Sequence, residues 1–160
     1  MSTSYRLRPL PPEVAREVRA SLLAPGYEHP AHVSTATGYG PCRVCLRKTV
    51  TGEERVILFT YDPFAGREPF PLPSPVYVHE HDCDPYAHDE RFPEELRDVD
   101  VTLNAYAPGR ILRAQERVAG ADADDALAAL FERDDVDYVH VRNTRAGCFI
   151  VEAVRRPAGT

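Results

Sequence analysis

The chain has 160 residues, of which 43% are hydrophobic and 28% are charged, and its formal net charge is −6. This length and composition fit one globular domain, residues 1–160, with a hydrophobic core of its own and loose termini at 1–10 and 156–160. The acidic balance argues against nucleic acid and anionic membranes as partners, because both require a basic face. It leaves a protein or a small molecule of unknown identity as the partner.

The N-terminal region predicts a cytoplasmic protein. It lacks the apolar segment of a signal peptide, and no apolar run approaches the ~20 residues of a membrane span. Cytoplasmic cysteines stay reduced, so we expect the four cysteines to be free thiols or metal ligands rather than disulfides.

The first predicted element is a helix that opens at Pro11 and Pro12, since proline is tolerated in the first helical turn. Apolar side chains then recur at helical spacing and form one stripe: Val14, Val18 and Leu22. Pro25 and Gly26 end the helix. Residues 27–41 show no periodicity and predict a loop.

Two strands are predicted in the next segment. Residues 55–61 are apolar on both faces, which is typical of a central strand, and residues 76–79 form a second, short strand. Residues 62–75 contain five prolines, which lack the N–H that strand pairing needs. We expect this stretch to be an unpaired loop that forms either a surface lid or a wall of a site.

The second half of the chain predicts a hairpin, a helix and two more strands. Residues 101–106 and 110–118 form the hairpin. Asp122 caps the helix, whose buried face is Ala126, Leu127, Leu130 and Phe131. Strands at 136–141 and 148–154 follow. This order indicates an α+β fold with two main helices and a mostly antiparallel sheet of five to six strands.

Cys42 and Cys45 are separated by two residues, a spacing at which a turn lets both thiols face one point. Cys83 and a neighbouring histidine complete a set of four soft ligands, which predicts a structural Zn²⁺ site. One alternative is a group of free, partly buried thiols. Another is a redox dithiol, which requires a helix N-terminus, whereas the β-branched residues after Cys45 favour a hairpin.

The choice of histidine depends on the backbone after residue 79. If the strand continues, His79 and Cys83 lie ~13 Å apart, whereas His81 and Cys83 lie ~7 Å apart on one face and can share an ion. If the chain turns, His79 joins Cys83, and Asp82 and Asp84 favour a turn. We therefore expect His79 as the ligand and keep His81 as its alternate.

A second group of residues, Cys148, His140 and Asn143, matches the residue types of a thiol hydrolase. In such an enzyme histidine takes the thiol proton and asparagine orients the ring. The alternative function is therefore an enzyme that uses a reactive cysteine, Cys148 or Cys42, with His140. A satisfied strand histidine, a loop-capping asparagine and a small buried cysteine explain the same residues without catalysis.

Several segments resemble the small bacterial proteins grouped as domain-of-unknown-function family 1203, and the resemblance covers roughly residues 40–154. They are residues 74–80 (SPVYVHE), 103–106 (LNAY), 138–143 (YVHVRN) and 147–149 (GCF). The family usually has Gly where Ser74 stands and Arg where Asn104 stands.

The resemblance implies no activity, because the family has none established. Some members share the cysteine pair together with His79 and Cys83, which also favours His79 as a ligand. From the residues and the resemblance together we expect a small cytoplasmic bacterial protein that carries one structural zinc and acts as a binding or accessory module.

Overall fold

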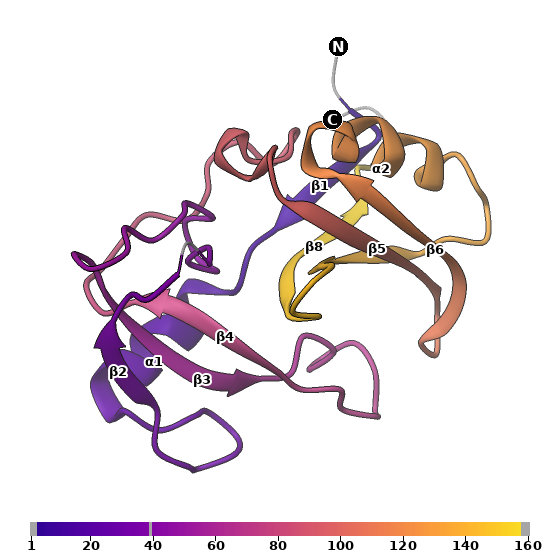
Figure 1. The fold of residues 1–160 in the computed structure, drawn as a ribbon. Helices are drawn as coiled ribbons and strands as arrows, with labels where there is room; N and C mark the ends of the chain where they lie inside the picture. Colours follow the sequence, from indigo (N-terminus) through magenta and orange to yellow (C-terminus); the bar gives the residue numbers. More distant parts are fainter. Residues whose placement is uncertain (1–2, 39, 158–160) are drawn as a thin grey trace. The chain divides into compact units, whose positions relative to one another are not determined.

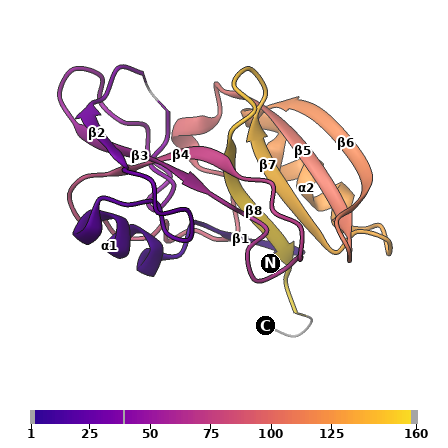
Figure 2. The same cartoon turned by 90° about the horizontal axis from the view of Figure 1, so that it is seen from below.

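The computed structural model describes residues 3–38 and 40–157, and the chain divides into two compact units. Pro9–Ala87 forms one of them, called here the inserted unit. Met1–Arg8 and His88–Thr160 form the other, the flanking unit. Each unit has its own antiparallel sheet, as the two views in Figures 1 and 2 show.

The inserted unit combines one helix with a three-stranded sheet in the order β2-β3-β4 (Figure 1). Its elements are α1 (Pro12–Ser21), β2 (His32–Thr35), β3 (Arg55–Tyr61) and β4 (Ser74–His79). The central position predicted for residues 55–61 is confirmed, because β3 pairs with both neighbours. One hydrophobic cluster joins Val18 of α1 to Ile57 of β3 and also contains Cys42 and Cys45. The cysteine pair is therefore part of the core of this unit.

Three details of the inserted unit differ from the sequence-based expectation. β2 lies within residues 27–41, predicted as a loop; its four residues are half-buried or exposed, so they carry no hydrophobic pattern. β4 begins at Ser74 and includes Pro75, where we expected no pairing; β4 is an edge strand, and edge strands tolerate proline. Leu22 leaves the apolar stripe, since it ends the helix with φ 55° and is 43% exposed.

The flanking unit is built on a five-stranded antiparallel sheet in the order β1-β8-β7-β5-β6, with β7 between β8 and β5 (Figure 2). Its elements are β1 (Tyr5–Arg8), the 3-10 turn η1 (Glu94–Leu96), β5 (Asp100–Ala107), β6 (Ile111–Ala119), the 3-10 turn η2 (Gly120–Asp122), α2 (Ala123–Phe131), β7 (Tyr138–Asn143) and β8 (Phe149–Arg155). The predicted hairpin is confirmed as β5 and β6. The predicted second helix is α2, although Asp122 makes no side-chain capping hydrogen bond.

Helix α2 lies on one face of this sheet. The ring of Tyr5 in β1 stacks on Phe131 of α2, with the ring centroids 6.3 Å apart. Leu127 and Leu130 are buried with Phe131, whereas Ala126, predicted for the same face, is half-buried. Side chains alternate between the two faces of a strand, so His140 of β7 and its neighbours in register face away from α2.

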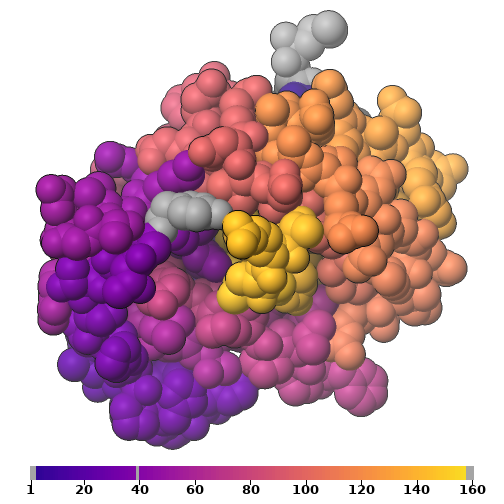
Figure 3. All heavy atoms as spheres, in the orientation of Figure 1, coloured from indigo at the N-terminus to yellow at the C-terminus, as the bar shows by residue number. Residues whose placement is uncertain are grey.

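The predicted α+β class, the two helices and the antiparallel pairing are confirmed, with eight strands among the described residues. Within the termini that we expected to be loose, Tyr5 pairs with Arg155 and places β1 at the edge of the sheet. The backbone N–H of Arg156 also donates to Ser4, while residues 1–2 and 158–160 lie outside the described part. C-terminal residues (yellow) reach the surface shown in Figure 3. None of the described helices combines the length and apolar character needed to cross a membrane.

Candidate metal centre

Cys42 and Cys45 lie in a tight backbone turn. The N–H of Leu46 donates to the carbonyl of Cys42 at 2.8 Å, and the N–H of Cys42 donates to the carbonyl of Arg47 at 3.0 Å. Leu46 takes the left-handed conformation, with φ 59°, that such a reversal needs. The chain therefore doubles back as the sequence predicts, and no helix follows Cys45.

The second pair of ligands is formed by a bend at the end of β4. The strand ends at His79 and the chain bends at Glu80, so Cys83 returns to the side of His79. Arg19 of α1 holds this bend: its Nε donates to the carbonyl of His79 at 2.9 Å. Its two other nitrogens donate to Oδ1 of Asp82 at 3.3 Å and to Sγ of Cys83 at 3.6 Å. The predicted turn is confirmed, and helix α1 is tied to the site.

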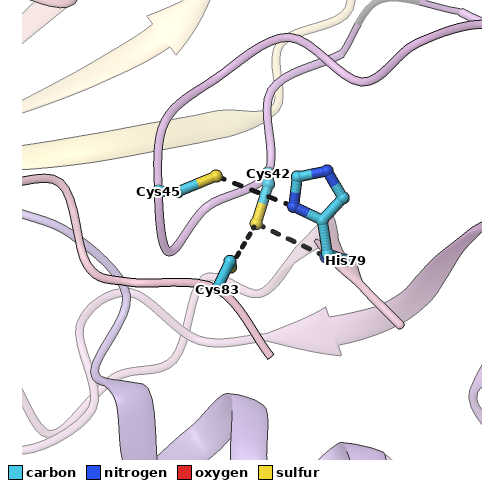
Figure 4. Close-up of side chains that lie close together, drawn as sticks. All are labelled: Cys42, Cys45, His79 and Cys83. Carbon is cyan, nitrogen blue, oxygen red and sulfur yellow. Dashed lines mark hydrogen bonds between the residues drawn. The ribbon is translucent and has the colours of Figure 1, made fainter. Parts of the chain in front are cut away.

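The structure brings the predicted ligands Cys42, Cys45, His79 and Cys83 together (Figure 4). One ligand atom from each lies within 4.8 Å of all the others, so the cluster can hold a metal ion. Sγ of Cys42 lies 3.7 Å from Sγ of Cys83, and Sγ of Cys45 lies 3.6 Å from Nδ1 of His79. All four cysteines of the chain are free thiols.

These separations match the spacing expected of sulfur and nitrogen ligands around one tetrahedral ion, for which zinc supplies the reference distances. Zn–S bonds of about 2.3 Å at the tetrahedral angle place two sulfurs about 3.8 Å apart, and a Zn–N bond of about 2.0–2.1 Å places sulfur and nitrogen about 3.6 Å apart. A disulfide requires about 2.05 Å between its sulfurs, which is far shorter than the observed distance. The donor set therefore fits one tetrahedral ion.

A carboxylate lies beside the ring nitrogen of His79 that faces away from Cys45. Nε2 of His79 lies 2.9 Å from Oε2 of Glu54, outside hydrogen-bond alignment, while Nδ1 faces Cys45. Metal-binding histidines usually direct their second ring nitrogen to a carboxylate in this way. His81, the alternate ligand, lies outside the cluster of thiols; it is exposed, and its ring centroid is 4.6 Å from that of His79.

The cluster is closed to solvent on most sides. Cys42 is 0% exposed, His79 is 4% exposed and Cys45 is 8% exposed, whereas Cys83 is half-buried. The backbone N–H of His79 also donates to Sγ of Cys42 at 3.4 Å. Four protein ligands leave no coordination position for a substrate or a water, which is typical of structural rather than catalytic sites.

The metal-free thiols share their protons unequally. Hydrogen bonding with the side chains of Cys45 and Cys83 holds the pKa of the Cys42 thiol well below its usual range. Hydrogen bonding with the side chain of Cys42 raises the pKa of the Cys45 thiol. Hydrogen bonding to the sulfurs of Cys42 and Cys83 raises the pKa of His79 to about 10. The cluster therefore stabilises a thiolate, which is the form of cysteine that binds metal ions.

The hydrogen bonds of Cys148, His140 and Asn143 do not form a catalytic arrangement. The thiol of Cys148 donates to the carbonyl of Ala146 at 3.8 Å, and Nε2 of His140 lies 3.2 Å from Oε1 of Glu152. Oδ1 of Asn143 accepts two backbone N–H groups of the turn between β7 and β8. Asn143 therefore caps a turn, and the hydrogen bond described for Cys148 goes to Ala146.

The sequence analysis does not predict two residues that contact the candidate site, Arg19 and Glu54. Arg19 lies off the apolar stripe of α1, and nothing in the sequence indicates that this face of the helix meets the bend after β4. Glu54 immediately precedes β3, and Val56 pairs with His79. If the β3–β4 register were known, Glu54 could therefore be placed near His79 from the sequence.

The comparisons with known proteins identify a family and no closer relative. The profile of the family described as "Protein of unknown function (DUF1203)" matches residues 39–156. No curated protein and no solved structure matches the chain.

Proposed function

The chain belongs to the DUF1203 family of proteins of unknown function, and we propose that it binds one structural Zn²⁺ through Cys42, Cys45, His79 and Cys83. The observation that carries this proposal is the convergence of four ligand atoms within 4.8 Å, from two segments of the chain and with a carboxylate behind the histidine.

Zinc suits this donor set better than other common ions. Three thiolates and one imidazole are soft or borderline ligands, which disfavours Mg²⁺ and Ca²⁺ because those ions prefer oxygen. Tetrahedral geometry with sulfur and nitrogen donors is typical of zinc, and iron is the main competitor for sulfur-rich tetrahedral sites. Metal analysis separates the two.

The ion would act as a crosslink within the inserted unit. It would join the turn at Cys42 and Cys45 to the bend at His79 and Cys83, to which Arg19 already ties helix α1. We propose that a chain held in this way is a binding or accessory module and that no chemistry occurs at the ion, because a closed site has no free coordination position. A cytoplasmic location, where thiols stay reduced, agrees with the four free cysteines.

Alkylation before and after metal removal tests the proposal. In protein purified without chelator, we expect iodoacetamide to label Cys148 at the rate of an ordinary thiol and to leave Cys42, Cys45 and Cys83 unlabelled until a chelator is added. Cys148 is half-buried and lies outside the cluster, so it serves as the internal control.

Each other outcome of this experiment points to a different alternative. Protection of the three thiols that persists after complete metal removal would show that burial alone shields them. Labelling of all four cysteines at one rate without chelator would show that no ion is held. Rapid, selective labelling of Cys148 at pH 6 that is lost in His140→Ala would favour the enzyme with a reactive cysteine.

A further inference from the structure

A second group of metal-binding side chains lies beside the thiol site and shares His79 with it. One ligand atom from each of Glu54, His79 and His81 lies within 4.8 Å of the other two. We call these three residues the outer group. Its two imidazoles and one carboxylate are donors that Zn²⁺ and Co²⁺ accept, and three ligands leave coordination positions for water.

Solvent exposure decreases from the outer group to the thiol site. His81 is exposed, the Glu54 side chain is 27% exposed and His79 is 4% exposed, whereas Cys42 is fully buried. Of the three cysteines, Cys42 and Cys45 are buried and Cys83 is half-buried. A hydrated ion that approaches on the side of His81 and Glu54 therefore meets these two residues before the sulfurs of Cys42 and Cys45. Replacing its waters one by one, with nitrogen and oxygen first and sulfur afterwards, avoids a bare ion at any stage.

The two groups compete for the imidazole of His79. Its Nδ1 faces Sγ of Cys45, and its Nε2 faces the carboxylate of Glu54. A neutral imidazole keeps one proton and binds a metal through its other nitrogen. An ion in the thiol site therefore leaves the proton on Nε2, directed at Glu54, and the outer group loses one of its three ligands.

We propose that the outer group is a capture site that binds a divalent ion from solution and transfers it to the thiol site. This inference rests on the proposed zinc binding by the thiols. In the capture step the ion displaces the proton on Nε2 of His79 and some of its own waters. In the transfer step bonds to Glu54, His81 and Nε2 break, bonds to Nδ1 and three sulfurs form, and the thiol protons pass to solvent. The remaining imidazole proton moves through solvent from Nδ1 to Nε2.

Stopped-flow uptake of Co²⁺ by the metal-free protein tests this assignment. Cobalt bound to thiolates has an intense charge-transfer absorption that cobalt bound to nitrogen and oxygen lacks, so the band reports arrival at the thiol site. We expect His81→Phe to slow the appearance of the band about fivefold or more, with the Co²⁺ dissociation constant within about twofold of wild type.

Two design features separate ligation from packing. The Phe variant keeps an aromatic ring against His79 but has no ring nitrogen that could bind a metal, and His81→Ala should slow uptake to the same extent. His32→Ala is the matched control, because His32 is an exposed histidine of the same unit outside both ligand groups. It should bind cobalt at the wild-type rate.

The outcomes that overturn the inference differ from those that overturn the thiol site. Uptake at the wild-type rate in both His81 variants would refute the capture site and leave the thiol site standing. A slower rate with a proportionally weaker affinity would also refute it, because His81 would then act through the stability of the bound state. Absence of the charge-transfer band from wild-type protein would refute the thiol site, and the capture site with it.

Discussion

Replacing Glu54 by Gln tests whether the carboxylate behind His79 supports the metal. Oε2 of Glu54 lies 2.9 Å from Nε2 of His79, and Oε1 accepts the backbone N–H of Val50 at 2.7 Å. Gln has nearly the same shape as Glu, and its amide oxygen can still accept the backbone N–H of Val50. Its NH₂ group then points at the Nε2–H of His79. The variant thus replaces one attraction with two facing donors and leaves the local turn intact.

The expected size of this effect follows from the role and exposure of the carboxylate. Loss of such an outer partner typically weakens metal binding 10- to 100-fold. The Glu54 side chain is 27% exposed, so solvent screens part of the interaction and we expect the lower end, about tenfold. That corresponds to about 1.4 kcal/mol of binding free energy.

Competition against a chromophoric zinc chelator measures this affinity directly. Glu53→Gln is the matched control, because it removes the neighbouring exposed carboxylate, which lies outside both groups of ligands. The control should bind zinc as wild type does. A Glu54→Gln variant with an affinity within about twofold of the control would refute the argument that this carboxylate orients His79.

Two further substitutions test how the site is held and what it supports. Arg19→Met should weaken zinc binding about tenfold, because it removes the donors to the His79 carbonyl and to Cys83. Arg16→Met, from the exposed side of α1, is the control and should leave the zinc affinity unchanged. Equal affinities in the two variants would contradict the role of Arg19 in holding the ligands. Cys45→Ser should speed amide hydrogen exchange around the cysteine turn while the chain keeps a cooperative melt. The core of the inserted unit also contains apolar side chains of α1, β3 and β4 that do not bind the ion, and the flanking unit contains none of the four ligands. Loss of the cooperative melt would show that the ion supports the whole fold.

Sequence patterns predict the strongly periodic elements of this fold and miss the short edge strands. Residues 55–61 and 101–106 carry enough apolar side chains to mark a strand, and α2 shows its buried face in the spacing of Leu127 and Leu130. β1 and β2 have four residues each, and β1 pairs with β8, at the other end of the chain. Such pairing depends on tertiary structure, which local periodicity does not contain.

In the candidate site, too, residues fixed by local backbone geometry are predicted from the sequence, whereas residues brought in by tertiary packing are not. Cys42 and Cys45 are found from spacing alone, because a local turn fixes their geometry. His79 is preferred over His81 only through the predicted bend before Cys83, which the structure contains. Glu54 and Arg19 reach the site through the β3–β4 register and the packing of α1, so only the folded chain identifies them.

Metal analysis of protein purified without chelator tests the central claim most directly. Four protein ligands around one point predict one Zn²⁺ per chain, and the same ratio should return after the protein is unfolded, freed of metal and refolded with zinc. Substoichiometric metal in both native and refolded samples, with the thiols of Cys42, Cys45 and Cys83 titrating freely, would contradict it.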